Sequence, residues 1–121
     1  ARAGATTITN WGSGNPRREF LHVDDMATAC LHLMEHYDGA AQVNVGSETD
    51  VTIKELAGIV ADATGFNGSV GWDTSKPDGM AQKLLDVSRL TEYGWTPQID
   101  LAPGITSTVE WYREHHAGAR R

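Results

Sequence analysis

The stretch that decides the fold is Trp11-Gly12-Ser13-Gly14-Asn15-Pro16-Arg17-Arg18-Glu19-Phe20. It follows a β-branched run at residues 6–10, so we expect a short strand that ends in a glycine- and proline-rich loop. The G-x-G pattern runs into a proline instead of opening a helix, which argues against a dinucleotide-binding turn. The loop still places an indole and two guanidinium groups beside flexible backbone, a combination suited to a phosphate-bearing ligand. The simpler interpretation is a turn with a core tryptophan and solvated arginines.

The rest of the sequence alternates between strand-like and helix-like segments. We expect further strands at residues 19–23, 42–45 and 69–72, and helices at 24–37, 52–64, 88–93 and from 101 onward. Asp24 is the expected N-cap of the first helix, and Thr52 with Glu55 forms a capping box for the second. This alternation predicts an α/β fold. Because the strands are few and short, we expect them to complete a Rossmann-type sheet whose remainder lies upstream of Ala1.

Apolar periodicity predicts which helix faces are buried. In the first helix the residues expected to face a core are Ala27, Cys30, Leu33, Met34 and Tyr37, and in the last helix Ile105, Val109 and Tyr112. Cys30 is therefore interpreted as buried filler and not as a nucleophile. As the single cysteine of the chain, it excludes an internal disulfide, which is typical of a reducing compartment.

Composition narrows the class of protein. The chain has 121 residues, the size of one ordinary domain, and we treat residues 1–121 as one unit. A formal net charge of −6 argues against a broad nucleic-acid interface, because such interfaces need clustered Lys and Arg. No apolar run approaches the roughly 20 residues of a membrane helix, and the start lacks a signal-peptide profile. We therefore expect a cytoplasmic protein that binds neither nucleic acid nor membrane.

A second loop, residues 76–86, carries charged groups in a constrained turn. Lys76 and Lys83 flank the rigid turn Pro77-Asp78-Gly79. Cations next to an acceptor carboxylate are what a pyrophosphate with an attached ribose requires. Turn formation alone would also explain the Pro-Asp-Gly sequence, with the lysines solvated.

The segment from His32 to His36 matches the H-x-x-E-H pattern of inverted zinc proteases. Two imidazoles four residues apart on a helix could share a metal ion. No third ligand is evident, so we interpret this segment as a solvated polar face and expect no metal site. His115 and His116, at the end of the last predicted helix, receive the same interpretation.

No catalytic set can be assembled from this sequence. It contains no Ser or Cys nucleophile motif, and no Tyr is followed four residues later by Lys. The chain therefore has residues suited to binding and none suited to catalysis.

Together with the segments that follow them, the two loops resemble the GDP-L-fucose synthases, a family of extended short-chain dehydrogenases/reductases. The family pattern WGSG-x-P-x-REFLHVDDMA is followed by an INVG-type strand, a T-I-x-EL helix, KPDG-x-x-x-KLLDV and an R-L-x-x-x-GW turn. The matching stretches here are 11–27, 43–46, 52–56, 76–87 and 89–95. Their order and spacing cover the chain from about Ile8 to Tyr112.

The resemblance implies an NADPH-dependent enzyme that epimerises GDP-4-keto-6-deoxy-D-mannose and then reduces its keto group, giving GDP-L-fucose. It also implies that the NADP-binding turn and the catalytic residues lie upstream, so this chain alone is expected to be inactive and to bind no cofactor. Residues 24–46 are expected to pack with that upstream nucleotide-binding domain, and the resemblance suggests a homodimer.

Four residues correspond by position to substrate contacts of the family: Trp11, Arg18, Asp78 and Lys83. Arg18 and Lys83 would neutralise the pyrophosphate, while Asp78 would accept hydrogen bonds from nucleotide hydroxyl or amino groups. Trp11 would supply a flat apolar wall. The run Met80-Ala81-Gln82 stands where the family often has Thr-Pro-Arg, which leaves one cation fewer and bears on guanine preference and phosphate affinity.

Two other interpretations remain. The chain could be the substrate lobe of another nucleotide-sugar epimerase or dehydratase, or a non-catalytic module that binds nucleotide sugars. The start at Ala1, directly before a strand and without an initiator Met, favours a longer parent over a free-standing module.

Overall fold

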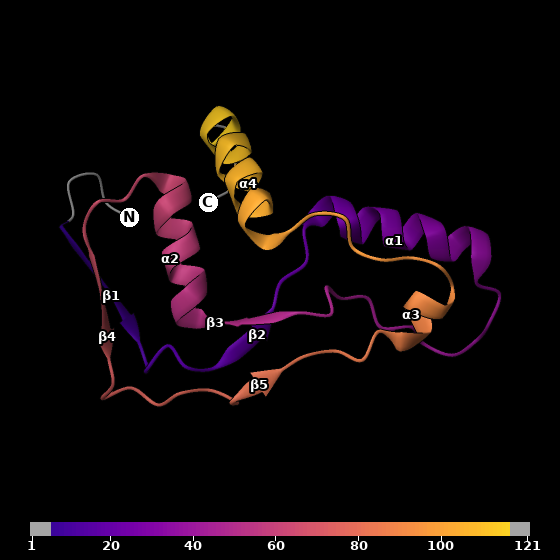
Figure 1. Cartoon of the computed structure of the whole chain (residues 1–121), viewed down its shortest axis with the longest axis horizontal. Coiled ribbons are helices and arrows are strands. Elements are labelled where there is room, and N and C mark those ends of the chain that lie inside the picture. The colour runs from indigo at the N-terminus through magenta and orange to yellow at the C-terminus, as the bar shows by residue number, and fades with distance from the viewer. Residues whose placement is uncertain (1–5, 117–121) are drawn as a thin grey trace.

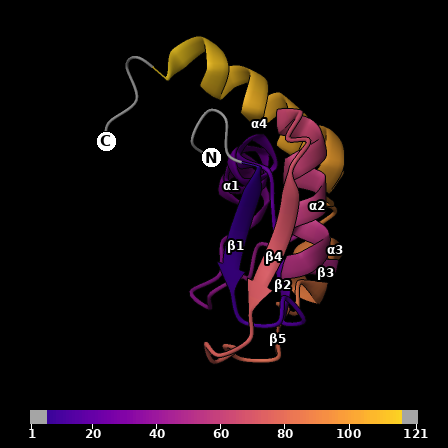
Figure 2. The ribbon, with the colours of Figure 1, turned by 90° about the vertical axis from the view of Figure 1, so that its left-hand side faces the viewer.

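The computed structural model describes residues 6–116 and shows two small sheets and four helices among them (Figure 1). The first sheet pairs β1 (Thr7–Trp11) in parallel with β4 (Ser69–Asp73). In two views turned by 90°, α2 (Ile53–Thr64) lies next to β4 (Figure 2). The helix α4 (Leu101–His115) packs against α2. The predicted strands at residues 6–11 and 69–72 are thus confirmed.

The second sheet has the order β3-β2-β5. Its central strand β2 (Arg17–Glu19) runs antiparallel to β3 (Asp50–Thr52) and parallel to β5 (Gln82–Lys83). The two strands that flank β2 come from segments about 30 and 65 residues away along the chain, so this sheet joins distant parts of the sequence.

Local sequence signals explain where α2 begins and ends. Thr52 Oγ1 accepts from the Glu55 N–H at 3.1 Å, and the Glu55 carboxylate accepts from the Thr52 N–H at 2.7 Å. This reciprocal pair satisfies two donors that the helix itself leaves free. Gly65 ends α2 in the left-handed conformation with φ 69°, as predicted.

The buried core lies between α1 (Val23–His36) and α3 (Ser88–Glu92). Ala29, Leu90 and Trp95 form this core, and Leu21, Leu33, Val43 and Val45 pack against it. The short helix predicted at residues 88–93 is confirmed, and Gly94 follows it with φ 88°.

Three local predictions are wrong. The extended segment expected at 19–23 is a strand at residues 17–19, because β2 pairs where β3 and β5 offer partners. Asp24 is not the N-cap of α1; that position is His22, whose Nδ1 accepts from the Asp24 N–H at 3.2 Å. Residues 42–45 form no strand, since no described segment pairs with them and their valines instead pack on the core.

The predicted apolar face of α1 is also wrong in part. Leu33 packs against the core, but Cys30 and Ala27 are exposed and Met34 is 80% exposed. The reason is a rotation of the helix about its axis, since Ala29 and Asp25 are the buried residues of α1. In α4, Ile105 and Val109 are partly buried as expected, whereas Tyr112 is exposed.

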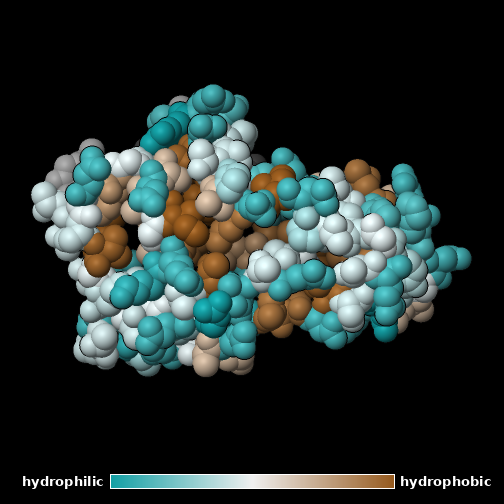
Figure 3. Space-filling model, viewed as in Figure 1, coloured by the Kyte–Doolittle hydropathy of each residue, from teal (hydrophilic) through white to brown (hydrophobic). Residues whose placement is uncertain are grey.

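As a consequence, α1 presents a continuous apolar stripe to solvent. Its large exposed members are Val23, Met26, Leu31 and Met34. In the space-filling view, apolar surface lies over α1 and in the groove between α2 and α4 (Figure 3). None of the described helices is long and apolar enough to span a bilayer.

Candidate functional site

The two predicted loops lie together and are joined by Asp78. Its Oδ1 accepts from the Ser13 N–H at 2.8 Å, and its Oδ2 accepts from the Ser13 hydroxyl at 2.7 Å. These two bonds, the hydroxyl bond first, hold the pKa of Asp78 below its usual value because both stabilise the charged carboxylate. Gly12 has φ 87°, and a Cβ placed on it would lie 2.5 Å from Asp78 Oδ1. Glycine at this position thus permits the close approach of the two loops.

The first loop is also fixed from the side of α2. The Lys54 N–H donates to the Gly14 carbonyl at 2.9 Å, and the Ile53 N–H donates to the Pro16 carbonyl at 3.0 Å. Both donors belong to the first turn of α2, where N–H groups have no partner within the helix. The Trp72 ring packs closely against this loop. A Cβ added to Gly14 would lie only 2.9 Å from the ring, so this position needs a glycine.

Arg18 and Lys83 are neighbours across the parallel pair β2 and β5, where they are register partners. Both line a hollow of about 520 Å³ whose other lining residues are Glu19, Met80, Gln82, Leu84 and Leu85. Arg18 Nη1 donates to the Arg17 carbonyl at 2.7 Å, and its Nη2 lies close to the position that a Cβ on Gly79 would take, at 3.3 Å. The two cations that the sequence predicted to converge therefore share one hollow.

The negative charge of Glu19 in this hollow is already engaged by backbone donors. Its Oε1 accepts from the Ser47 and Glu48 N–H groups at 2.8 and 3.0 Å, and its Oε2 accepts from the Leu85 N–H at 3.3 Å. A carboxylate held by backbone N–H groups is a weaker competitor for nearby cations than a free one. Arg18 and Lys83 form no ion pair among the described residues.

Trp11 lies at the end of β1 and is 77% exposed. The Lys76 ammonium lies 5.5 Å from the centroid of its ring, which is within the range of a cation–π contact. Trp11 does not line the hollow of Arg18 and Lys83, although its neighbour Ser13 is bound to Asp78. The structure thus brings Arg18 and Lys83 together at one hollow. Trp11 and Asp78 are linked to each other only through the loop that contains Ser13.

Sequence reasoning missed a network on the other face of β2. Arg17 Nε donates to Asp50 Oδ1 at 2.8 Å, and Gln82 Nε2 donates to Asp50 Oδ2 at 2.5 Å. These two bonds, that of Gln82 first, lower the pKa of Asp50 from its usual value. The signal that could have revealed the network is the adjacency of Arg17 and Arg18, because successive residues of a strand point to opposite faces.

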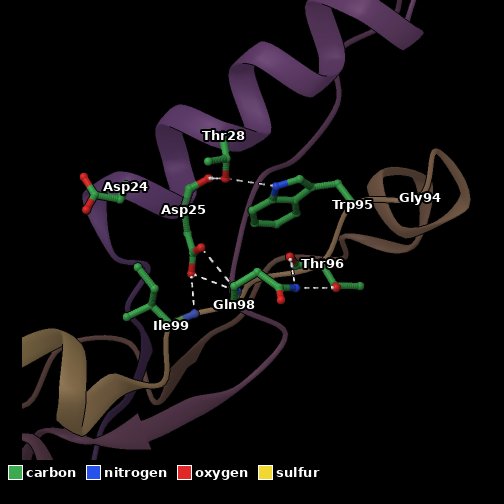
Figure 4. Close-up of a pocket in the computed structure, with 8 residues that line it drawn as sticks. All are labelled: Asp24, Asp25, Thr28, Gly94, Trp95, Thr96, Gln98 and Ile99. Atoms are coloured by element: carbon green, nitrogen blue, oxygen red, sulfur yellow. Dashed lines mark hydrogen bonds between the residues drawn. The ribbon is translucent and has the colours of Figure 1, made fainter.

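A second hollow, of about 400 Å³, lies between α1 and residues 94–99 (Figure 4). Its buried carboxylate, Asp25, is 2% exposed and accepts from the backbone N–H groups of Gln98 and Ile99. Trp95 Nε1 donates to Thr28 Oγ1 at 3.2 Å. In the close-up the Asp25 carboxylate points at these backbone donors, so its role is to fasten the chain that leads into α4.

The histidines of α1 are engaged in hydrogen bonds with carbonyl groups. His32 Nε2 bonds to the Tyr93 carbonyl at 2.6 Å, and His36 Nδ1 bonds to the His32 carbonyl at 2.9 Å. Their rings stack with centroids 4.2 Å apart. Within residues 6–116 no group of three or more His, Cys, Asp or Glu side chains could hold a metal ion.

Comparisons with known proteins give a consistent result. The NAD dependent epimerase/dehydratase family matches residues 1–46. The chain is 50% identical over 109 residues to GDP-L-fucose synthase 1 of Arabidopsis thaliana, covering 90% of this chain and 34% of that protein. It is 46% identical over 120 residues to GDP-L-fucose synthase of Escherichia coli, covering 92% of this chain and 37% of the relative. The chain thus spans about a third of the length of these relatives.

Solved structures show the same relationship. A GDP-L-fucose synthetase from Naegleria fowleri, described as bound to NADP, superposes with a TM-score of 0.88 at 30% identity, covering 95% of this chain and 37% of that one. A UDP-glucose 4-epimerase from Thermotoga maritima superposes with a TM-score of 0.79 at 26% identity, covering 91% and 36%. This chain is a small α/β unit that aligns to about a third of such structures. It is a homologue of the GDP-L-fucose synthases over about a third of their length, and the NAD dependent epimerase/dehydratase family matches its first 46 residues.

Proposed function

We propose that this chain is the sugar-nucleotide-binding part of a cytoplasmic, NADPH-dependent epimerase/reductase that makes GDP-L-fucose from GDP-4-keto-6-deoxy-D-mannose. The observation that carries the proposal is the pairing of Arg18 with Lys83 on adjacent strands at one hollow. A diphosphate carries charge on both phosphates, and a guanidinium beside an ammonium matches that arrangement. Among the described residues Glu19 forms no ion pair with these cations, and its carboxylate is bonded to backbone donors.

The roles proposed for the other two site residues differ in kind. Trp11 is a largely exposed, flat ring beside the loop and is available for stacking. Both oxygens of Asp78 already accept from Ser13, so a nucleotide hydroxyl would have to bind their remaining lone pairs. We therefore assign Asp78 two tasks, holding the glycine loop and accepting from the nucleotide.

The glycine loop of this chain lacks the features of an NADP-binding turn. The Gly12 and Gly14 loop leads into β2 and not into a helix, so it lacks the helix N-terminus that receives a pyrophosphate in dinucleotide-binding turns. We propose that NADPH and the catalytic groups belong to a nucleotide-binding domain outside this chain. The structural relatives described as NADP-bound extend well beyond the aligned part, since this chain covers 35 to 37% of them.

The exposed stripe of α1 is where we propose that such a domain packs, together with the unpaired segment 42–46. Large apolar side chains gather on this face, and burying them against a partner would remove them from water. Val43 and Val45 are partly buried already, but no described strand pairs with their backbone. Residues 24–46 would then form the boundary between the substrate-binding part and the nucleotide-binding domain.

A different nucleotide sugar is the second candidate. Relatives described as GDP-L-colitose synthase and GDP-mannoheptose C4 reductase are 36% and 33% identical to the chain, and a UDP-glucose epimerase shares its fold. The cation pair would bind the diphosphate of any of these. Base contacts distinguish them, and Gln82 stands in β5 where the resemblance leads us to expect an arginine.

Calorimetric titration with GDP and with UDP tests the proposal on this chain. We expect GDP to bind more tightly, and Arg18→Ala to weaken GDP binding by about 1.5–3 kcal/mol, the scale of a hydrogen bond to a charged group. Arg89→Ala is the matched control, because Arg89 Nη1 donates to the Gln42 carbonyl and lies outside the hollow. Equal GDP affinity of the Arg18→Ala variant and the unmodified chain would defeat the proposal.

A further inference from the structure

We infer that Asp50 is a positioning residue that holds Lys83 beside Arg18, although Asp50 itself does not line their hollow. The consequence for diphosphate binding rests on the function proposed above. The placement of β5 by Asp50 does not depend on the proposed function and can be tested without a ligand.

The carboxylate of Asp50 bridges all three strands of the second sheet. Asp50 belongs to β3, receives Arg17 Nε from β2 at 2.8 Å and receives Gln82 Nε2 from β5 at 2.5 Å. Arg17 Nη2 also donates to the Asp50 carbonyl at 2.9 Å. The Asp50 side chain is only 8% exposed; its bond to Arg17 is part-buried, and its bond to Gln82 lies at the surface.

β5 is a strand that needs such support. It has two residues, Gln82 and Lys83, and both are exposed. Next to these two residues, the Arg17 N–H of β2 donates a backbone hydrogen bond to the Ala81 carbonyl at 2.8 Å. A ladder this short gains little from its own hydrogen bonds, so side-chain bonds matter here: that from Gln82 to Asp50 at 2.5 Å and the longer one from the Leu85 N–H to Glu19 at 3.3 Å.

Register is the property that this bond protects. Gln82 is the register partner of Arg17, and Lys83 is therefore the partner of Arg18. A slip of one residue would turn Lys83 to the opposite face of the sheet, away from the Arg18 guanidinium. By holding Gln82 on the Arg17 face, Asp50 keeps Lys83 on the Arg18 face.

The change in anion binding on removal of Asp50 distinguishes a positioning role from a purely electrostatic effect. Removing a negative charge near two cations that bind an anion should, by Coulomb attraction alone, tighten binding of the anion. Loss of a positioning residue should instead weaken binding. The two explanations thus predict opposite results for the same substitution.

The experiment compares Asp50→Ala and Gln82→Leu with Asp62→Ala in this chain. Asp62→Ala removes the same charge from an exposed position on α2, and Gln82→Leu removes the bond to β5 without changing any charge. The ligand-free readout is amide hydrogen exchange of the Arg17 N–H, with the Gly12 N–H, which donates to the Asp73 carbonyl, as internal reference. The binding readout is calorimetric titration with GDP.

We expect exchange at Arg17 to speed up by at least about tenfold in Asp50→Ala and Gln82→Leu, relative to Gly12, and GDP binding to weaken about five- to tenfold, the scale of coupling within one hydrogen-bond network. Exchange at Arg17 in the double variant should be no faster than in Asp50→Ala alone, because Asp50→Ala has already lost the bond that Gln82→Leu removes. Asp62→Ala should match the unmodified chain in both readouts.

Three outcomes would overturn the inference: unchanged exchange at Arg17, GDP binding that is unchanged or tighter in Asp50→Ala, or additive increases of exchange at Arg17 in the double variant. If the unmodified chain does not bind GDP, the proposed function fails and the exchange result alone decides the positioning role. Should Asp50→Ala not fold, the exchange readout of Gln82→Leu decides the positioning role, since Gln82 is exposed but also lines the hollow that would bind GDP.

Discussion

Two halves of this molecule are stabilised by different forces. In the helical half, formed by α1 and residues 87–99, lie Ala29, Val87, Leu90 and Trp95, which are the buried hydrophobic residues of the part that the structure describes. In the loop half, formed by β2, β3, β5 and residues 12–16 and 74–86, segments are joined by the carboxylates of Asp78, Asp50 and Glu19. Apolar burial tolerates changes of pH and small shifts, whereas hydrogen-bonded carboxylates demand a defined geometry.

The comparison teaches that stability and binding geometry are built separately. The predicted ligand contacts lie in the half with little buried apolar surface, where glycines and carboxylates fix the position of the loops. Asp25 is the exception, a buried carboxylate in the helical half, and it too binds a loop to a helix. Substitutions in the two halves should therefore have separable effects.

The largest effect is expected for Leu90→Ala. Leu90 is 1% exposed and fills the core between α1 and α3, so truncation should lower the free energy of unfolding by about 2–5 kcal/mol. Urea denaturation followed by circular dichroism measures this change. The control Leu84→Ala removes a leucine that is 44% exposed in the loop half and should cost less than about 0.5 kcal/mol. Similar losses for the two variants would contradict the proposed division.

Gly12→Ala tests the packing of the loop half. The substitution introduces strain at φ 87° and places a Cβ against Asp78 Oδ1, so we expect a loss of about 1–3 kcal/mol in thermal denaturation. Gly58→Ala is the matched control, since Gly58 lies inside α2 with no atom within 4 Å of the added Cβ. That change should stabilise the chain by about 0.5–1 kcal/mol. A neutral result at Gly12 would show that the loops need not approach closely.

The loop half should also be the more sensitive to acid. The pKa of Asp78 is held below its usual value by Ser13, so its contribution to stability is complete above about pH 4 and is lost as the pH falls through the folded pKa. Ser13→Ala removes the hydroxyl donor and should raise the pKa of Asp78 toward its usual value, as measured by NMR titration of the carboxyl carbon. An unmoved titration would rule out Ser13 as the cause.

The smallest effect on stability is expected for Met34→Gln. Met34 is 80% exposed on the apolar stripe of α1, so the free energy of unfolding should change by no more than about 0.5 kcal/mol. The same variant should reduce co-purification with the part of the E. coli relative that this chain does not cover, because it places an amide in the proposed boundary. Undiminished co-purification would argue against packing at this face.

How much the sequence predicts depends on the range of the interaction. The capping box of Thr52 and Glu55 and the end of α2 at Gly65 are local signals, and both were confirmed. The strand expected at 42–45 was wrong because a strand requires a partner, and no described segment pairs with it. Cys30 was wrongly placed in the core because periodicity gives the spacing of an apolar face but not the direction in which that face points.

The candidate site divides in the same way. Turn chemistry located both loops and their cations, and Arg18 and Lys83 do share a hollow. The bond between Ser13 and Asp78 spans 65 residues, and that between Asp50 and Gln82 spans 32. The adjacent arginines indicate that one of them faces away from the hollow, but no local pattern identifies these partners. The register of β2 with β5 is a tertiary property, and it alone gives Arg17 and Arg18 their different partners.

The alternation of the two arginines along β2 has a consequence for chain-length variation. An added or deleted residue in the glycine loop would disturb its bonds to Asp78 and to α2, yet the alternation of the arginines along β2 would remain. The same event inside β2 would exchange the two guanidinium groups, presenting Arg17 to the hollow and Arg18 to Asp50. Natural variants of this segment should therefore keep the number of residues from Arg17 to Glu19 constant.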